Sequence, residues 1–149
     1  MKVHSKSAWQ EAQITAFLKE ACIPLRIASP GTDGYPTICS LWFLYEDGAL
    51  WSASHKNAYI VSQLQNDPNV GFEIATNEFP YRGVRGRGTA TLSGENAGTL
   101  LQRLITRYLQ NSNQELAQWL MSRAADELAI RITPHTINAW DFSHRMQKS

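Results

Sequence analysis

The stretch TICSLWFLYEDGALWSAS, residues 37 to 54, sets the fold class. Residues 37 to 45 are rich in β-branched, aromatic and other bulky side chains, as strands are. Both sides of this run are apolar, so we expect it to be a strand covered on both faces. The EDG that follows at 46 to 48 predicts a hairpin turn. ALWSAS, at 49 to 54, then returns as the partner strand.

Similar patterns extend outward in both directions. We expect helices after Ser7, over 56–68 and twice within 95–125, and strands over 23–29, 69–76, 81–92, 128–133 and 136–142, the last two divided at Pro134 and His135. Ser7 with Gln10, and Ser112 with Glu115, fit capping boxes at two helix starts. Six or seven short strands with inserted helices predict a mainly β chain, largely antiparallel, forming one domain over residues 1–149.

Composition excludes several classes of protein. The chain has 149 residues, 43% of them hydrophobic, which is unlike a disordered protein. Its net charge of +1 argues against a dedicated nucleic-acid domain, because such domains gain most of their affinity from excess positive charge. The two cysteines form no CxxC pair, and no apolar run approaches the roughly 20 residues of a membrane span. We therefore expect a cytoplasmic protein with free thiols and no membrane or nucleic-acid partner.

The stretch YRGVRGRGTATL, residues 81 to 92, concentrates positive charge on a predicted strand. Alternation places Arg85 and Arg87 on one face and Val84 on the other, with Arg82 at the strand's start. Guanidinium groups bind anions, and the intervening glycines would let a ligand approach the backbone. The alternative is a solvated face whose arginines are balanced by acids such as Glu73.

A second candidate anion site is WSASHKNA, residues 51 to 58. Ser52 and Ser54 share a strand face, and Lys56 stands at the entrance to a predicted helix. Hydroxyls, a lysine and free helix N–H groups together suit a phosphate, although serines at strand ends and helix caps are also common. Trp42 and Trp140 lie in strands, where they would either flank a planar ring or belong to the core.

The order of these motifs resembles the pyridoxamine 5′-phosphate oxidase-like superfamily of flavin-binding split barrels. The resemblance rests on DGYPTICSLWFLYEDGALWSAS, LQNDPNVGFEI and YRGVRGRGTATL, and on the closing WDF at 140–142. It covers residues 24 to 92 well and the helical part at 95–125 only loosely. It implies a six-stranded antiparallel split barrel that forms a homodimer, with two FMN molecules in grooves at the dimer interface.

The resemblance also implies a set of cofactor-binding residues. The FMN phosphate would be held by Ser52, Ser54 and Lys56, and the isoalloxazine ring would lie along a strand that carries Thr37, Ser40 and Trp42. The arginine strand would approach the same groove, with the residues Arg82, Arg85 and Arg87. Trp140 would reach the ring from the neighbouring subunit.

The sequence departs from true pyridoxamine 5′-phosphate oxidases, because SASHKNAY replaces their SRK-type phosphate motif and the tail lacks their arginine-bearing signature. Vitamin B6 oxidation is therefore not expected. The prediction is an FMN-dependent oxidoreductase acting on a small molecule of unassigned identity. The alternative is a non-catalytic module that holds haem, another tetrapyrrole or deazaflavin, with His55 or His135 as the axial ligand to haem. No histidine spacing matches a metal motif, so no metal site is expected.

Overall fold

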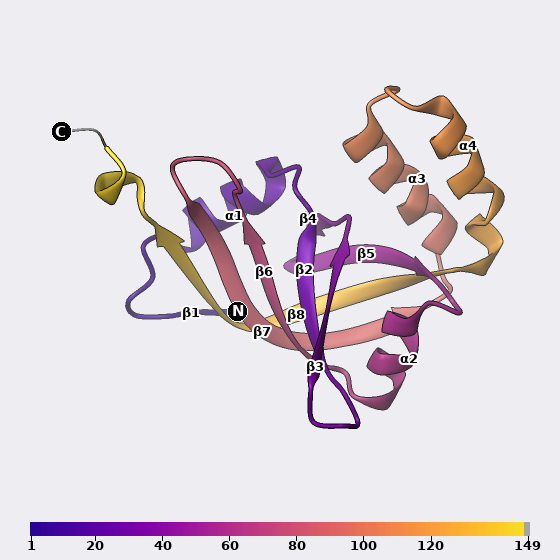
Figure 1. The fold of residues 1–149 in the computed structure, drawn as a ribbon, viewed down its shortest axis with the longest axis horizontal. Helices are drawn as coiled ribbons and strands as arrows, with labels where there is room; N and C mark the ends of the chain where they lie inside the picture. The colour runs from indigo at the N-terminus through magenta and orange to yellow at the C-terminus, as the bar shows by residue number, and fades with distance from the viewer. Residues whose placement is uncertain (148–149) are drawn as a thin grey trace.

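The computed structural model describes residues 1–147, which form a curled antiparallel sheet with helices packed around it (Figure 1). The strands are β1 (Lys2–Val3), β2 (Leu25–Pro30), β3 (Pro36–Leu41), β4 (Leu44–Glu46), β5 (Ala49–His55), β6 (Asn69–Ala75), β7 (Arg82–Ser93) and β8 (Glu127–Asp141). The helices are α1 (Glu11–Glu20), α2 (Tyr59–Asn66), α3 (Ala97–Leu109) and α4 (Gln114–Ser122), with short 3₁₀ turns at Ala124–Asp126 and Ser143–Arg145. The mainly β prediction is confirmed.

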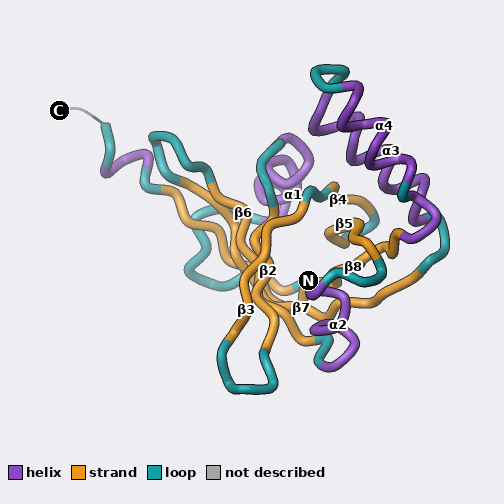
Figure 2. Tube along the Cα trace, turned by 45° about the vertical axis from the view of Figure 1, so that its right-hand side comes forward, coloured by secondary structure: helices purple, strands orange, loops and turns teal. Residues whose placement is uncertain are grey.

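The sheet has eight strands within the described residues, not the six that the resemblance implied. Their order is β3-β2-β6-β7-β8-β5-β4, and neighbouring strands in this order are antiparallel. The short strand β1 pairs with β8 in parallel. Figure 2 shows this sheet curling into a half-barrel, with α3 and α4 on one side. The two end strands, β3 and β4, are not hydrogen-bonded to each other, so the barrel stays open there.

The run at 37–45 is two strands rather than one. β3 pairs with β2 and β4 pairs with β5, and the chain changes partner at Trp42 and Phe43. Trp42 stacks on Tyr108 of α3, with ring centroids 5.2 Å apart, and the Phe43 N–H donates to the Tyr108 hydroxyl at 3.2 Å. The expectation that both faces of this run are covered is also wrong, because Ile38, on the outward face of β3, is 70% exposed.

The two C-terminal strands expected at 128–133 and 136–142 are in fact one continuous strand, β8. Gly88 of β7 pairs with Pro134 and Arg87 pairs with Thr136, so His135 is an extra residue in a β-bulge. Pro134 donates no backbone hydrogen bond, and the bulge accommodates it without ending the strand. The first half of β8 joins β7 to β5, whereas the second half joins β7 to β1.

The two predicted helix caps are displaced, from Ser7 to Gln10 and from Ser112 to Asn113. Helix α1 starts after Gln10, which forms a capping box with Gln13, because the Ser7 hydroxyl instead donates to the Trp9 carbonyl. Helix α4 starts after Asn113, whose side-chain oxygen accepts the Leu116 N–H at 2.9 Å. Asparagine fits this position as well as the predicted serine does.

The main core lies inside the half-barrel. It is formed by the inward faces of the strands together with α1 and α2, and its fully buried members include Ile14, Leu18, Leu25, Ile27, Phe43, Leu50, Ile74, Ile130 and Ile132. A smaller cluster beneath α3 contains Leu44, Ala97, Leu100, Leu104 and Ala129. Within residues 1–147, no helix is both long enough and apolar enough to cross a membrane. The other face of β2, β3, β6 and β7 is covered by neither helix pair (Figures 1 and 2).

Candidate functional site

The outward face of strands β3, β2, β6, β7 and the second half of β8 presents side chains in rows that run across the sheet. Strand register places the first row as Ser40, Arg26, Glu73, Arg85 and Asn138. The second row is Ile38, Ala28, Gly71, Arg87 and Thr136. Residues between these rows, such as Ile27 and Phe72, point to the core, as the two-residue period of strands requires.

Two adjoining hollows lie on this face, and together they are called the outer groove below. The first has a volume of about 600 Å³ and is lined by members of both rows and by His4. The second, about 670 Å³, extends toward the β2–β3 hairpin and His135. They share Ala28, Gly71, Arg87 and Thr136, which are the members of the second row other than Ile38. Each hollow has the size of a small-molecule site.

The floor of the outer groove is flat at Gly71. A Cβ placed on Gly71 would meet only Ala28 Cβ and the Gly86 carbonyl oxygen, both at 3.9 Å. The glycines of the arginine strand behave differently, because a Cβ on Gly86 would lie 2.6 Å from the Phe72 ring. Gly83 and Gly88 are likewise packed against neighbouring strands. Gly86 lines the first hollow and Gly88 the second, so the close approach of a ligand to these glycines stays a prediction. The structure adds that all three glycines also make room for neighbouring strands, whereas Gly71 has open space above it.

The three predicted arginines do not share one environment. Arg85 and Arg87 both point into the outer groove, as alternation predicted. Arg82 stands across from Asp141 on β8, outside the lining of the outer groove, and its charge helps to keep the pKa of Asp141 below its usual range. The larger cause of that low pKa is the hydrogen bond from Ser143. Two of the three arginines are therefore brought together.

The second predicted anion site lies at the corner between β5 and α2. Lys56 Nζ is 2.7 Å from Asp126 Oδ1, and the Lys56 N–H donates to the Asp126 carbonyl at 2.8 Å. The hydrogen bond from Lys56, followed by its positive charge, lowers the pKa of the Asp126 carboxyl. Ser52 is fully buried on the core side of β5, and its hydroxyl has no hydrogen-bond partner. None of the three predicted phosphate ligands lines the outer groove.

The remaining predicted residues also divide between the two faces. Thr37 pairs with Ser29 on the inward side of β3, whereas Ser40 pairs with Arg26 on the outward side. Trp42 packs against Tyr108. Trp140 follows Asn138 on the outward side of β8, opposite Gly83, and its indole N–H is buried with no partner. Thr37, Ser40 and Trp42 therefore do not form one continuous surface in this chain.

Sequence reasoning missed several residues of the outer groove. Arg26 sits in LRIAS between two buried residues, Leu25 and Ile27, so its outward direction follows from the same alternation that located Arg85. Asn138 lies in the first row, and its side-chain oxygen is buried without a partner. His4 reaches the outer groove because its backbone N–H donates to the Ile137 carbonyl at 2.8 Å. That contact joins residues near the two ends of the chain, so no local sequence pattern predicts it.

Comparison of the sequence with known protein families agrees with this sheet and this order of motifs. A family model described as pyridoxamine 5′-phosphate oxidase matches residues 10–141. The chain belongs to this family. The resemblance stated from the motifs is confirmed, and the match also includes the helical part that the motifs covered only loosely. A search of curated proteins finds no match.

Solved structures share the family's fold at low sequence identity. A conserved hypothetical protein from Mycobacterium tuberculosis is 21% identical with a TM-score of 0.79, and the alignment covers 100% of this chain and 95% of that one. An F420 reductase is 20% identical with a TM-score of 0.69, covering 81% of this chain and 93% of that one. A haem storage protein from Vibrio cholerae is 16% identical with a TM-score of 0.66, covering 88% and 94%. At these identities the likeness shows the fold alone.

Proposed function

We propose that this protein binds a flavin-type cofactor, with FMN as the first candidate, and uses it to transfer a hydride or electrons to or from a small molecule. The observation that carries the proposal is the outer groove, where a flat floor at Ala28 and Gly71 lies beside Arg26, Arg85 and Arg87. Family membership and the names of two structural relatives, an F420 reductase and an FAD-binding protein from Mycobacterium smegmatis, support it.

The residues present fit a flavin. An isoalloxazine ring has an edge with one N–H between two carbonyl groups, so it needs both an acceptor and donors beside a flat surface. The unpartnered Asn138 oxygen offers the acceptor, and the neighbouring Arg85 offers the donors. The Trp140 indole N–H, on the same side of β8, is also buried without a partner, but Trp140 lies outside the lining of the outer groove.

A bound flavin would supply the redox chemistry, and the chain would bind and orient it. Arg26 and Arg85 flank Glu73 across the strands, so the first row carries a net positive charge that favours an anionic group near the ring. Lys56 stays the predicted partner of the FMN phosphate, and it must leave Asp126 to serve in that role. We further propose a homodimer whose contact face includes the outer groove, because Ile38 is an apolar side chain left 70% exposed there. A cytoplasmic location is kept as the expectation, since Cys22 and Cys39 are free.

The visible absorption spectrum of the full chain after addition of FMN, followed by gel filtration, tests this proposal. Retained bands near roughly 370 and 450 nm are expected. Arg85→Ala should weaken FMN binding and lower the rate of flavin reduction, whereas Arg82→Ala, on the same strand but outside the outer groove, is the matched control. A colourless protein, or full FMN affinity and reduction rate in both Arg85→Ala and Arg87→Ala, would contradict the proposal.

The second candidate function is a non-catalytic haem module, and the position of His135 favours it. His135 lines the second hollow at the β8 bulge, where its Nε2 atom lies 2.6 Å from Thr89 Oγ1, whereas His55 lines neither hollow. The haem storage relative shares the fold. A Soret band that forms on haem addition and disappears in His135→Ala, in a chain that retains no flavin, would establish this function instead.

A further inference from the structure

We propose that Arg87, rather than Arg85, is the anion-binding residue of the outer groove, and that it holds a phosphate or carboxylate group of the ligand above Gly71. The inference deepens the proposed function and rests on it in taking the outer groove as the ligand site. It assigns different roles to two arginines that the sequence does not distinguish.

The first argument is position. Arg87 belongs to the lining of both hollows, and its companions there are Ala28, Gly71 and Thr136. A ligand long enough to occupy both hollows must cross this row. Arg85 lines only the first hollow.

The second argument is the set of neighbours. Arg85 pairs across the strands with Glu73 on one side and Asn138 on the other. Arg87 pairs with Gly71 and Thr136, neither of which carries a charge. No Asp or Glu lines the second hollow, and the ion pairs found within residues 1–147 do not include Arg87. The Arg87 guanidinium is thus an exposed cation whose cross-strand neighbours do not neutralise it.

The third argument is the space beside that cation. Because Gly71 has no side chain and Ala28 has only a methyl group, the surface next to Arg87 is low and flat. A planar carboxylate or a phosphate can therefore approach the guanidinium sideways and accept two parallel hydrogen bonds, the geometry that arginine favours.

Charge distribution agrees with an anionic ligand. The first hollow contains three arginines, Arg26, Arg85 and Arg87, against one carboxylate, Glu73, which leaves an excess of two positive charges. The whole chain carries only +1, so the rest of the molecule is slightly negative. Positive potential is therefore concentrated at the outer groove, where it attracts anions. The anion can be the phosphate of the cofactor or the acidic group of a substrate, and both have the same chemistry.

Isothermal titration of the full chain with inorganic pyrophosphate, FMN and riboflavin tests the inference. Loss of a charge-assisted hydrogen-bonding pair predicts that Arg87→Ala weakens pyrophosphate binding by about tenfold or more. Arg82→Ala, on the opposite side of β7, should change it by less than about twofold. Arg87→Lys, which keeps the charge but not the planar fork, should fall between them.

The three probes separate the two sources of the anion. If Arg87→Ala also weakens FMN but not riboflavin, the anion is the cofactor's phosphate; if FMN is unaffected and pyrophosphate is weakened, it belongs to the substrate. Pyrophosphate binding that depends on Arg87 in a chain that binds no flavin would support the inference while the proposed function fails. Flavin binding with all three probes unaffected by Arg87→Ala would overturn the inference and leave the proposed function standing.

A second variant tests the site from its floor. Gly71→Val is expected to keep the fold, because a Cβ there meets only ordinary contacts, but to weaken pyrophosphate binding by raising the surface beside Arg87. A second copy of the chain could occupy the outer groove in place of an anion. Analytical ultracentrifugation of the same variants tests this by measuring their oligomeric state. Dimer dissociation in Arg87→Ala, without any pyrophosphate binding by the wild type, would overturn the inference.

Discussion

The outer groove and the corner between β5 and α2 look alike in sequence but differ in the structure. Each combines cations with small or hydroxyl-bearing residues. In the outer groove, Arg87 has uncharged cross-strand neighbours. At the corner, Lys56 is already paired with Asp126 at 2.7 Å, and Ser52 points into the core. A cation therefore marks an anion site only when no acid elsewhere in the chain reaches it first, and the sequence does not show that.

The largest effect on the free energy of unfolding is expected at Gly86 of β7, and Gly71 of β6 provides the comparison. Gly86→Ala places a Cβ 2.6 Å from the Phe72 ring and against the Thr136 carbonyl oxygen, so it should lower the free energy of unfolding by about 3 kcal/mol. Gly71→Ala should change it by less than about 1 kcal/mol. Urea denaturation measures both, and equal losses would mean that Gly71 is packed like Gly86.

The buried Ser52 hydroxyl gives the next effect. Because this oxygen is fully buried without a hydrogen bond, Ser52→Ala should raise the free energy of unfolding by about 1 kcal/mol. FMN affinity should stay the same, since Ser52 faces the core rather than the outer groove. Ser54→Ala, at a half-exposed position on the same strand, serves as the comparison. A loss of FMN affinity in Ser52→Ala would instead show that the Ser52 hydroxyl takes part in phosphate binding.

A smaller effect should follow from releasing Lys56. Asp126→Asn removes the exposed ion pair and leaves the amine free to bind phosphate, so FMN should bind roughly twofold to fivefold more tightly relative to riboflavin. Fluorescence titration of both flavins measures the ratio. An unchanged ratio would show that Lys56 contributes nothing to phosphate binding.

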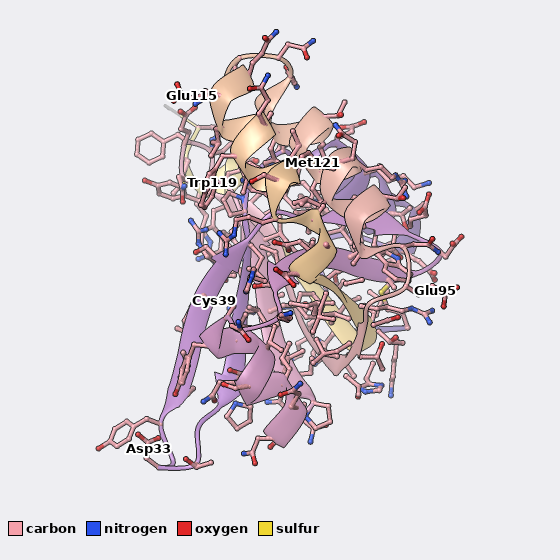
Figure 3. The ribbon with its side chains drawn as sticks, turned by 90° about the vertical axis from the view of Figure 1, so that its right-hand side faces the viewer. Asp33, Cys39, Glu95, Glu115, Trp119 and Met121 are labelled. Atoms are coloured by element: carbon pink, nitrogen blue, oxygen red, sulfur yellow. The ribbon has the colours of Figure 1, made fainter. Side chains whose placement is uncertain are left out.

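The smallest effect concerns Glu127, which pairs across the strands with His55 at the corner. Burial raises the pKa of Glu127, and the positive charges of Arg123 and His55 only partly oppose this. Its folded-state pKa is above the unfolded one, so its stabilising contribution is present at low pH and is lost as pH rises through that pKa. Glu127→Gln should therefore raise the melting temperature at pH 7 but not near pH 4. Glu115→Gln, on the exposed surface of α4 (Figure 3), is the control for the loss of one carboxylate.

Local patterns in the sequence predicted the parts of the fold that local physics decides. The EDG hairpin is confirmed, with positive φ at both Asp47 and Gly48, as a tight two-residue turn requires. Alternation placed Arg85 and Arg87 on one face and Val84 on the other, and the structure agrees.

What the sequence did not predict depends on contacts between distant residues. The break at Trp42 and Phe43 follows from Tyr108, which also donates to the Ile23 carbonyl at 2.9 Å. The pairing of Lys56 with Asp126 joins the residue just after β5 to the last residue of the 3₁₀ turn before β8, which is far away in the chain. The sequence predicts two strands divided at Pro134 and His135, whereas a bulge at His135 lets one strand continue. Neither capping boxes nor hydrophobic alternation carries information of this kind.

The long strand β8 also governs the order in which the protein can fold. It pairs with β7, β5 and β1, and β5 and β7 meet only through it in the sheet. During synthesis the hairpin of β4 and β5 therefore cannot join the rest of the sheet until residues 127–141 have left the ribosome. We expect the amides of β5 and the first half of β8 to become protected from hydrogen exchange together and late. We therefore expect the pairing of β8 with β5 to be the step that closes the sheet.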